Sequence, residues 1–230
     1  MNGFLLVNKE KGYSSNEIVQ KIKKKFSLNK VGHLGTLDPD AEGLLIIAIN
    51  RATKFSNYFL NSDKSYYVEI KLGKSTTTDD VSGEIIEEFE VKCSEDEVKK
   101  EINNFLGKSF QKPPFFSALK YKGKPLYEYA RAGIEIERPA RTVTIHQLDF
   151  LEFTAESSEF VLRVKCSKGT YIRSLLYDIG ESLGCGAVVT ELRRTQVGDF
   201  LEQDMVALDH LSELKENDPE ALQQFILPLG

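Results

Sequence analysis

The chain has 230 residues, of which 41% are hydrophobic, and its formal net charge is −5. This length and composition exclude a disordered or fibrous chain and fit one large domain, or two small ones, with a buried core. The negative total disfavours a protein that simply coats nucleic acid, but the charge is uneven. Lysine and arginine collect in residues 1–34 and 108–141, and acidic residues collect in 79–101 and after 202. Such a chain can present one cationic face to a phosphate backbone, although solvated helix faces explain the same runs.

The three cysteines, Cys93, Cys166 and Cys185, are odd in number and far apart. They fit neither a disulfide framework nor a metal site with paired spacing, and the three histidines are equally scattered. No apolar run approaches the roughly 20 residues of a membrane span, and the apolar run at the start is too short for a signal peptide. We therefore expect a soluble protein of the reducing cytoplasm.

The first half of the chain predicts an alternation of strands and helices. Residues 3–7 read as a buried strand, and Ser14 with Glu17 forms a capping-box pattern at the start of a helix that leaves its lysines on the outer side. Residues 44–49 form a continuous apolar run, which predicts a strand covered on both faces. Residues 51–60 look helical and 66–72 look like a strand. A second capping pattern, Ser94 with Glu97, predicts a helix over 94–106.

Residues 111–133 carry three prolines among aromatic and basic residues, so we expect an irregular excursion that ends in a short helix near 126–131. Loops of this length are usually functional. Two long strands are predicted at 141–153 and 159–166, then a helix over 169–183 stopped by Gly184 and Gly186, and a strand at 187–197. The acidic tail from residue 206 is predicted to be helical. The expected fold class is mixed α/β (α+β), around a largely antiparallel sheet.

One stretch carries the strongest chemical signal: VGHLGTLDPDAEGLLIIAIN, in which Asp38 lies in a Gly/Pro turn before an apolar strand. The ordinary explanation is a turn stabilised by hydrogen bonds from the Asp side chain to nearby amides. The alternative is a carboxylate that Pro39 restricts to extended geometry and aims into a cleft, where it acts as nucleophile or base. Its expected partner is Arg173, after a glycine in CSKGTYIRSL. A phosphate-binding loop at LGKST is rejected, because Val68 stands where that motif needs glycine.

Several long motifs in register resemble one family. They are GHLGTLDPDAEGLL, ATKFSNYFLNSDKSYYVEIKLG, PPFFSALKYKGKPLYEYARAG, CSKGTYIRSL and LGCGAVVTELRRTQVG. Together they are similar to the bacterial tRNA pseudouridine-55 synthases, the TruB family. The resemblance implies an enzyme that isomerises uridine 55 in the TΨC loop of tRNA to pseudouridine, without metal or cofactor. It assigns the catalytic carboxylate to Asp38 and the arginine that fixes its geometry to Arg173.

The resemblance also implies the residues that hold the substrate. Tyr66 matches the tyrosine that stacks on the target uracil, and His33 matches the histidine that holds the flipped nucleotides. Without the resemblance, both would pass as ordinary strand or loop residues. The remaining positions matched to uridine or RNA binding are Tyr171, Leu192, Lys9, Lys54 and Lys120. Residues 111–131 correspond to an insertion that grips RNA.

The resemblance implies a pseudouridine synthase fold over residues 1–230, with a central, largely antiparallel sheet flanked by helices. Its expected partner is the T-arm stem-loop of tRNA, bound by a monomer that needs no protein partner and no membrane. The C-terminal PUA domain common in the family is expected to be absent. Two departures stand out: Glu10 replaces the proline of the first motif, and Glu42 replaces a small hydroxyl residue in the Asp38 turn.

Two other functions stay open at this point. One is an RNA-folding chaperone that remodels the tRNA elbow, either in addition to the chemistry or instead of it. The other is a guide-RNA-dependent pseudouridine synthase of the archaeal and eukaryotic type, which shares the catalytic turn.

Overall fold

A computed structural model describes residues 1–229, and the chain divides into two compact units, each described here by itself. Unit 1 comprises Met1–Tyr66 and the described part of Leu192–Gly230, and unit 2 comprises Tyr67–Glu191. The chain leaves unit 1 within strand β4 (Lys64–Leu72) and returns within strand β12 (Ala187–Val197). Both crossing points therefore lie inside β-strands and not in loop linkers.

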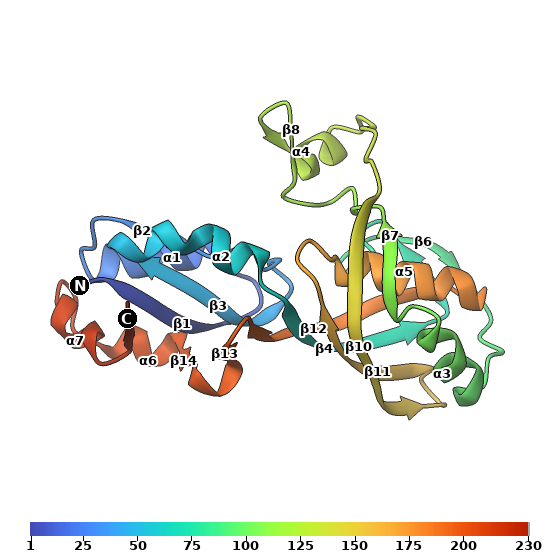
Figure 1. Ribbon diagram of the computed structural model, residues 1–230. Coiled ribbons are helices and arrows are strands. Elements are labelled where there is room, and N and C mark those ends of the chain that lie inside the picture. The colour runs from blue at the N-terminus through green and yellow to red at the C-terminus, as the bar shows by residue number, and fades with distance from the viewer. Residues whose placement is uncertain (230) are drawn as a thin grey trace. The chain divides into compact units, whose positions relative to one another are not determined.

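Unit 1 is built around strands β1 and β3 (Figure 1). Its elements are β1 (Gly3–Lys9), α1 (Ser15–Lys25), β2 (Val31–His33), β3 (Glu42–Ile49), the 3-10 helix η1 (Asn50–Phe55), α2 (Ser56–Asn61), β13 (Phe200–Leu201), the 3-10 helix η2 (Glu202–Asp204), β14 (Val206–Ala207), α6 (Leu208–Glu213), α7 (Pro219–Gln223) and β15 (Ile226–Pro228). Strand β3 runs antiparallel to β1 from the pair Gly3–Ile49 to the pair Lys9–Gly43. Strands β14 and β15 pair with β1, while β2 and the parallel strand β12 pair with β3.

The two faces of the β1–β3 pair bury two separate apolar clusters. Alternate residues, among them Leu5 and Ile47, pack with helices α1, α6 and α7. The residues between them, among them Phe4 and Ile46, pack with Ala52 and Phe59 from η1 and α2. This explains the unbroken apolar run of β3 and confirms the prediction of a strand covered on both faces. The capping box at the start of α1 is also present.

Unit 2 has a sheet of strands in the order β12-β4-β11-β10-β7. Its further elements are β5 (Lys74–Thr76), β6 (Ile85–Glu88), α3 (Glu95–Asn103), β7 (Gly107–Gln111), β8 (Lys120–Tyr121), β9 (Lys124–Pro125), α4 (Leu126–Arg131), β10 (Arg141–Thr154), β11 (Glu159–Cys166) and α5 (Ile172–Leu183). The long pair β10–β11 is antiparallel, as is β7–β10. The prediction of an α+β fold with a largely antiparallel sheet is confirmed.

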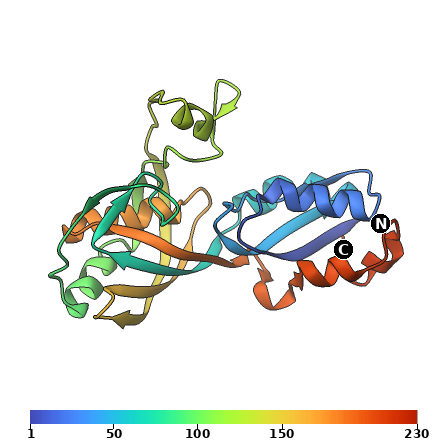
Figure 2. The same cartoon turned by 180° about the vertical axis from the view of Figure 1, so that it is seen from behind.

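The insertion, residues 111–131, contains the small hairpin β8–β9 and helix α4. In both views it projects beyond the ends of β7 and β10, away from the sheet of unit 2 (Figures 1 and 2). The predicted short helix is present. The hairpin was not predicted, because the prolines indicated irregular structure. The insertion therefore exposes most of its lysines and tyrosines while its base remains tied to the sheet.

Two sequence predictions need correction, and a third gains detail. The helix expected from residue 169 begins at Ile172, because Gly169 has φ +73° and Thr170 closes a turn onto the carbonyl of Ser167. The stretch 51–60 is helical, as predicted, and divides into a 3-10 helix and a short α-helix. The acidic tail is not continuously helical: strand β14 precedes α6, the Asp218 cap and Pro219 start the separate helix α7, and the apolar end forms β15.

Helix α5 packs so closely that one glycine in it has no room for a side chain. A Cβ on Gly180 would lie 2.3 Å from the backbone nitrogen of Ala187. Helix propensity alone favours alanine there by about 1 kcal/mol. We predict a destabilising effect instead. Gly180→Ala should lower the free energy of unfolding, measured in urea, by about 1–3 kcal/mol, because the backbone at Ala187 must move to make room for the methyl group. The exposed neighbour Glu181→Ala is the control and should change it by less than about 0.5 kcal/mol. A stabilised Gly180→Ala would contradict this packing.

Candidate active site

Asp38 lies in the loop that joins β2 to β3, and the backbone on both sides of it is fixed. The carbonyl and amide of Leu37 both bond to the hydroxyl of Ser15, each at 2.9 Å. The amide of Gly12 donates to the carbonyl of Pro39 at 2.9 Å, and the amide of Ala41 closes a turn onto the carbonyl of Asp38 at 3.1 Å. The half-buried Asp38 side chain is therefore carried by a loop whose main chain has little freedom.

Two buried cations add to this support. The ammonium of Lys9 donates to the carbonyls of Glu10, Tyr13 and Pro39 at 2.9, 2.7 and 3.1 Å. Arg194 donates to the carbonyls of Gly35, Thr36 and Leu44. Burial lowers the pKa of Lys9 to about 8, although the charge of Asp38 raises it. Lys9 thus supports the loop main chain from within the unit, with its side chain fully buried.

His33 is the last residue of β2, at the start of the same loop. Burial is the main cause of a lowered pKa, and the charge of Arg194 lowers it further. Its Nδ1 atom is buried without a hydrogen-bond partner among residues 1–229. A hydrogen bond with the backbone of Gly35 acts in the opposite direction and raises the pKa of His33.

Tyr66 and Leu192 lie on β4 and β12, strands that neighbour each other in the sheet. Tyr66 is 8% exposed, and Leu192 is half-buried. The hydroxyl of Ser65, next to Tyr66, donates to the side-chain oxygen of Gln196 on β12 at 3.2 Å. Lys54 is exposed at the end of η1, at a different place in unit 1.

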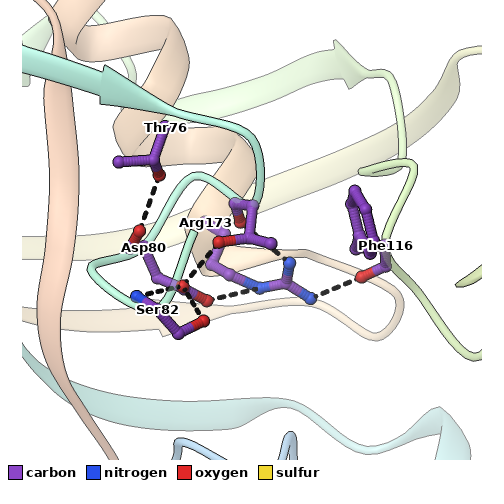
Figure 3. A network of polar contacts seen from close by, with 6 residues as sticks. Thr76, Asp80, Ser82, Phe116 and Arg173 are labelled. Atoms are coloured by element: carbon purple, nitrogen blue, oxygen red, sulfur yellow. Dashed lines mark hydrogen bonds and ion pairs between the residues drawn. The ribbon is translucent and has the colours of Figure 1, made fainter. Parts of the chain in front are cut away.

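In unit 2, Arg173 occupies the first turn of α5 and is 6% exposed. Its guanidinium donates to the carbonyl of Thr78 at 3.0 Å and to that of Phe116 at 2.9 Å, and its Nε lies 3.9 Å from the carboxylate of Asp80. Figure 3 shows it between the turn that carries Asp80 and the base of the insertion. Asp80 is fixed in turn by the hydroxyls of Thr78 and Ser82. Arg173 thereby joins α5, this turn and the insertion within unit 2.

Tyr171, two residues before Arg173, is held by a side-chain amide. Gln111 accepts from its backbone nitrogen at 2.8 Å and donates to its carbonyl at 3.0 Å. The guanidinium of Arg141 lies 4.9 Å from the centre of the Tyr171 ring. Lys120 is exposed on β8 in the insertion, away from these contacts.

Glu42, the departure in the Asp38 turn, has a partner. Its carboxylate lies 3.1 Å from Nη1 of Arg193, whose Nε lies 2.8 Å from Glu202. Arg193 therefore joins the start of β3 to η2. This pair accounts for an acidic residue at position 42 by a structural contact inside unit 1.

The structure groups the predicted residues by unit. His33, Asp38, Lys9, Tyr66, Leu192 and Lys54 belong to unit 1, and Tyr171, Arg173 and Lys120 belong to unit 2. Sequence reasoning missed Ser15, Asp80, Gln111 and Arg194. One signal was available for Arg194: it alternates in register with Val188 and Leu192 along a strand, which places a cation at a core-facing position. Among residues 1–229, no group of three or more metal-ligating side chains is present.

Two family models match the chain over residues 23–230. The model of the TruB family pseudouridylate synthase N-terminal domain matches residues 23–172, and that of the tRNA pseudouridylate synthase B C-terminal domain matches residues 173–230. The chain belongs to the TruB family. A relative from Actinobacillus pleuropneumoniae, called tRNA pseudouridine synthase B, is 49% identical over 230 residues, which are 100% of this chain and 75% of that protein. One of the same name from Haemophilus influenzae is 48% identical over 229 residues, 99% of this chain and 73% of its own.

Solved structures extend the likeness of this TruB-family chain to its fold. A Cbf5-Nop10-Gar1 complex contains a chain with a TM-score of 0.74 and 29% identity, matched over 98% of this chain and 60% of its own. An H/ACA RNP bound to a substrate RNA with 2′-deoxyuridine contains another similar chain, with a TM-score of 0.68 and 29% identity. The match covers 90% of this chain and 51% of that one. Within residues 1–229, no helix combines the length and apolar character needed to cross a membrane.

Asp79, next to Asp80, provides a pH test of this part of unit 2. Burial raises its pKa to about 6 from 3.8, while the charge of Arg173 lowers it. Because the folded state keeps a proton that the unfolded state has lost, stability falls as pH rises from 3.8 to about 6. The free energy of unfolding of Asp79→Asn should therefore exceed that of the unmodified protein by on the order of 1–2 kcal/mol at pH 7.5 and by little at pH 4.

Asparagine suits this position because Asp79 has φ +62°, a conformation that asparagine tolerates well. Urea unfolding at the two pH values measures the effect, and Asp199→Asn in an exposed turn is the matched control. Equal effects of Asp79→Asn at both pH values would contradict the raised pKa.

Proposed function

We propose that this TruB-family enzyme isomerises uridine 55 in the TΨC loop of tRNA to pseudouridine, with Asp38 as its catalytic carboxylate. The observation that carries the proposal is the fixed main chain on both sides of Asp38, where Leu37 bonds to Ser15 and Pro39 bonds to Lys9 and Gly12. A carboxylate held in this way meets the requirement of a catalytic group that must approach one sugar carbon closely.

The reaction is an isomerisation, so its atoms balance without a co-substrate. The bond between N1 of uracil and C1′ of the ribose breaks, the uracil turns over, and C5 bonds to C1′. The proton on C5 leaves and N1 gains one. In the proposed mechanism Asp38 assists by attack on the ribose or by removal of a proton from it, and Arg173 fills the family's arginine role.

Contacts within each unit support the remaining assignments. The target base must leave the RNA stack, which costs a few kcal/mol and is offset by stacking and pocket contacts. We assign stacking to Tyr66, contact with the flipped nucleotides to His33, and the lining of the uridine pocket to Tyr171 and Leu192. His33 lies at the start of the loop that carries Asp38, which suits this role. Lys9 supports the loop that carries Asp38.

The insertion is proposed to grip the RNA. Its cations and rings lie together: Nζ of Lys122 is 5.4 Å from the centre of the Tyr121 ring, and the guanidinium of Arg131 is 5.4 Å from that of Tyr127. Exposed cations beside exposed rings suit a backbone with unstacked bases. Lys120 belongs to this surface, and Lys54 is a further proposed RNA contact. We treat residues 1–230 as one catalytic domain containing this insertion, active as a cytoplasmic monomer without a protein partner.

The decisive variant is Asp38→Asn. It should abolish pseudouridine formation in a T-arm stem-loop, as measured by mass spectrometry, because the amide can neither attack nor accept a proton. The Kd for the RNA should change by less than about threefold, or about 0.7 kcal/mol. Asp40→Asn, an exposed carboxylate of the same loop, is the control and should keep its activity. Product from Asp38→Asn would refute the assigned mechanism.

Arg173→Lys tests the role of the guanidinium. Lysine keeps the charge but cannot reproduce the planar fork that reaches two carbonyls and faces Asp80. We expect the single-turnover rate to fall by about 100-fold, since a small misplacement of a catalytic group costs this much. Arg163→Lys, on the exposed side of β11, is the control. An unchanged rate in Arg173→Lys would remove Arg173 from the mechanism.

A second candidate is the guide-RNA-dependent type. The solved neighbours include chains from a Cbf5-Nop10-Gar1 complex and an H/ACA RNP, which favours keeping this alternative in the test. Activity of the purified chain alone on an unmodified T-arm stem-loop would exclude dependence on a guide. A tRNA-folding chaperone role, in addition to the chemistry, is tested with Asp38→Asn by measuring whether this inactive variant still accelerates the folding of tRNA.

A further inference from the structure

We propose that Arg194 is a positioning residue for the reaction: it fixes the loop segment that precedes Asp38. This inference rests on the proposed function, because it takes Asp38 as the catalytic carboxylate. It adds a residue on β12 whose side chain serves the loop without touching the substrate.

The position of Arg194 follows from the register of three strands. Gly43, at the start of β3, pairs with Lys9 on one side and with Arg194 on the other. The row Lys9–Gly43–Arg194 thus crosses the sheet of unit 1 at the end where the Asp38 loop enters β3. Two cations stand on the two sides of that entry point.

The guanidinium of Arg194 bridges the loop and strand β3. Its Nη2 donates to the carbonyl of Gly35 at 3.1 Å and its Nη1 to that of Thr36 at 3.2 Å, both in the part of the loop before Asp38. Its Nε donates to the carbonyl of Leu44 at 2.9 Å, in β3, which follows the loop. Arg194 is 2% exposed, so these carbonyls would lack comparable partners without it.

Close packing makes this arrangement specific. A Cβ on Gly43 would lie 2.4 Å from the carbonyl oxygen of Arg194, and Gly43 has φ +100°. A Cβ on Gly35 would lie 3.7 Å from Nη1 of Arg194. The backbone of Arg194 therefore lies against the start of β3, and its guanidinium lies beside Gly35 in the loop.

The neighbouring arginine makes different contacts. Arg193 pairs with the carboxylates of Glu42 and Glu202 and is partly exposed. Arg194 bonds to main-chain carbonyls, which are neutral and fixed in place. A buried charge used in this way sets the loop geometry, because each donor of the planar fork selects one acceptor position.

Loss of Arg194 should act on the chemical step. The arm before Asp38 would lose two of its bonds, while Lys9 and Gly12 would still hold Pro39 after it. The carboxylate would remain in the loop but in a wider range of positions, and such misplacement lowers rate more than binding.

The test uses Arg194→Met and Arg194→Lys in the full chain, with a T-arm stem-loop as substrate. We expect the single-turnover rate at saturating enzyme to fall by about 100-fold in the methionine variant and by less in the lysine variant. The Kd for the RNA should stay within about threefold. A merely structural residue would instead lower the fraction of folded enzyme and leave the rate per folded molecule unchanged.

Leu222→Ala is the control for stability, because Leu222 is fully buried in the same unit but packs in α7, in the cluster with α1 and α6. It should lower the Tm and leave the rate per folded molecule unchanged. If Arg194→Met does not fold, Arg194→Lys provides the milder test, since it keeps the charge but cannot reach all three carbonyls, and it should slow the reaction by about tenfold. If the folded Arg194 variants keep the full rate, the proposal is overturned.

Failure of the underlying function is recognised separately. Pseudouridine formation by Asp38→Asn would show that Asp38 is not the catalytic carboxylate, whatever the Arg194 variants do. With Asp38→Asn inactive and the folded Arg194→Met as fast as the unmodified enzyme, only the positioning role is refuted.

Discussion

The architecture of the Asp38 loop depends on one kind of interaction: a buried cation that donates to several main-chain carbonyls. Lys9 and Arg194 do this from the two strands that flank Gly43. Arg173 does it in unit 2, where it bonds to carbonyls of the Asp80 turn and of the insertion. Burying a charge is costly unless several hydrogen bonds compensate it, so these positions are fixed by the geometry of their acceptors. Lys9 and Arg194 thereby join the sheet to the loop, because each lies on a strand and donates to the main chain of the loop.

The same interaction explains which parts of the structure could be predicted. The β3 strand, the capped helices and the β10–β11 pair were predictable, because apolar periodicity and caps are local signals. The start of α5 at Ile172 was not, because the turn at Gly169 and Thr170 precedes it and Tyr171 bonds to Gln111, 60 residues away in the sequence. The candidate residues Asp38 and Arg173 were singled out from the Gly/Pro turn and from the segment CSKGTYIRSL, and the motif resemblance then assigned their roles. Arg194 and Asp80 were missed, because each contacts partners that are distant in the sequence: carbonyls near Asp38 for Arg194, and Arg173 for Asp80.

The family assignment and the structure answer different questions. The matches to the TruB family models place the chemistry in one class, and they cover residues 23–230. The structure adds how the loop around Asp38 is held: hydroxyl, amide and cationic donors reach its backbone from β1, α1 and β12, and from the turn at Gly12. The carboxylate of Glu42 forms an ion pair with Arg193, which also pairs with Glu202.

Glu10 shows a broader consequence of this anchoring. It replaces a proline of the family motif, yet its contribution to the loop is its carbonyl oxygen, which accepts from Lys9. Every amino acid has that oxygen. A hydrogen bond to a main-chain carbonyl does not depend on which side chain that loop position carries. A substitution at Glu10 or Thr36, whose side chains are exposed, therefore keeps the carbonyl oxygens that accept from Lys9 and Arg194.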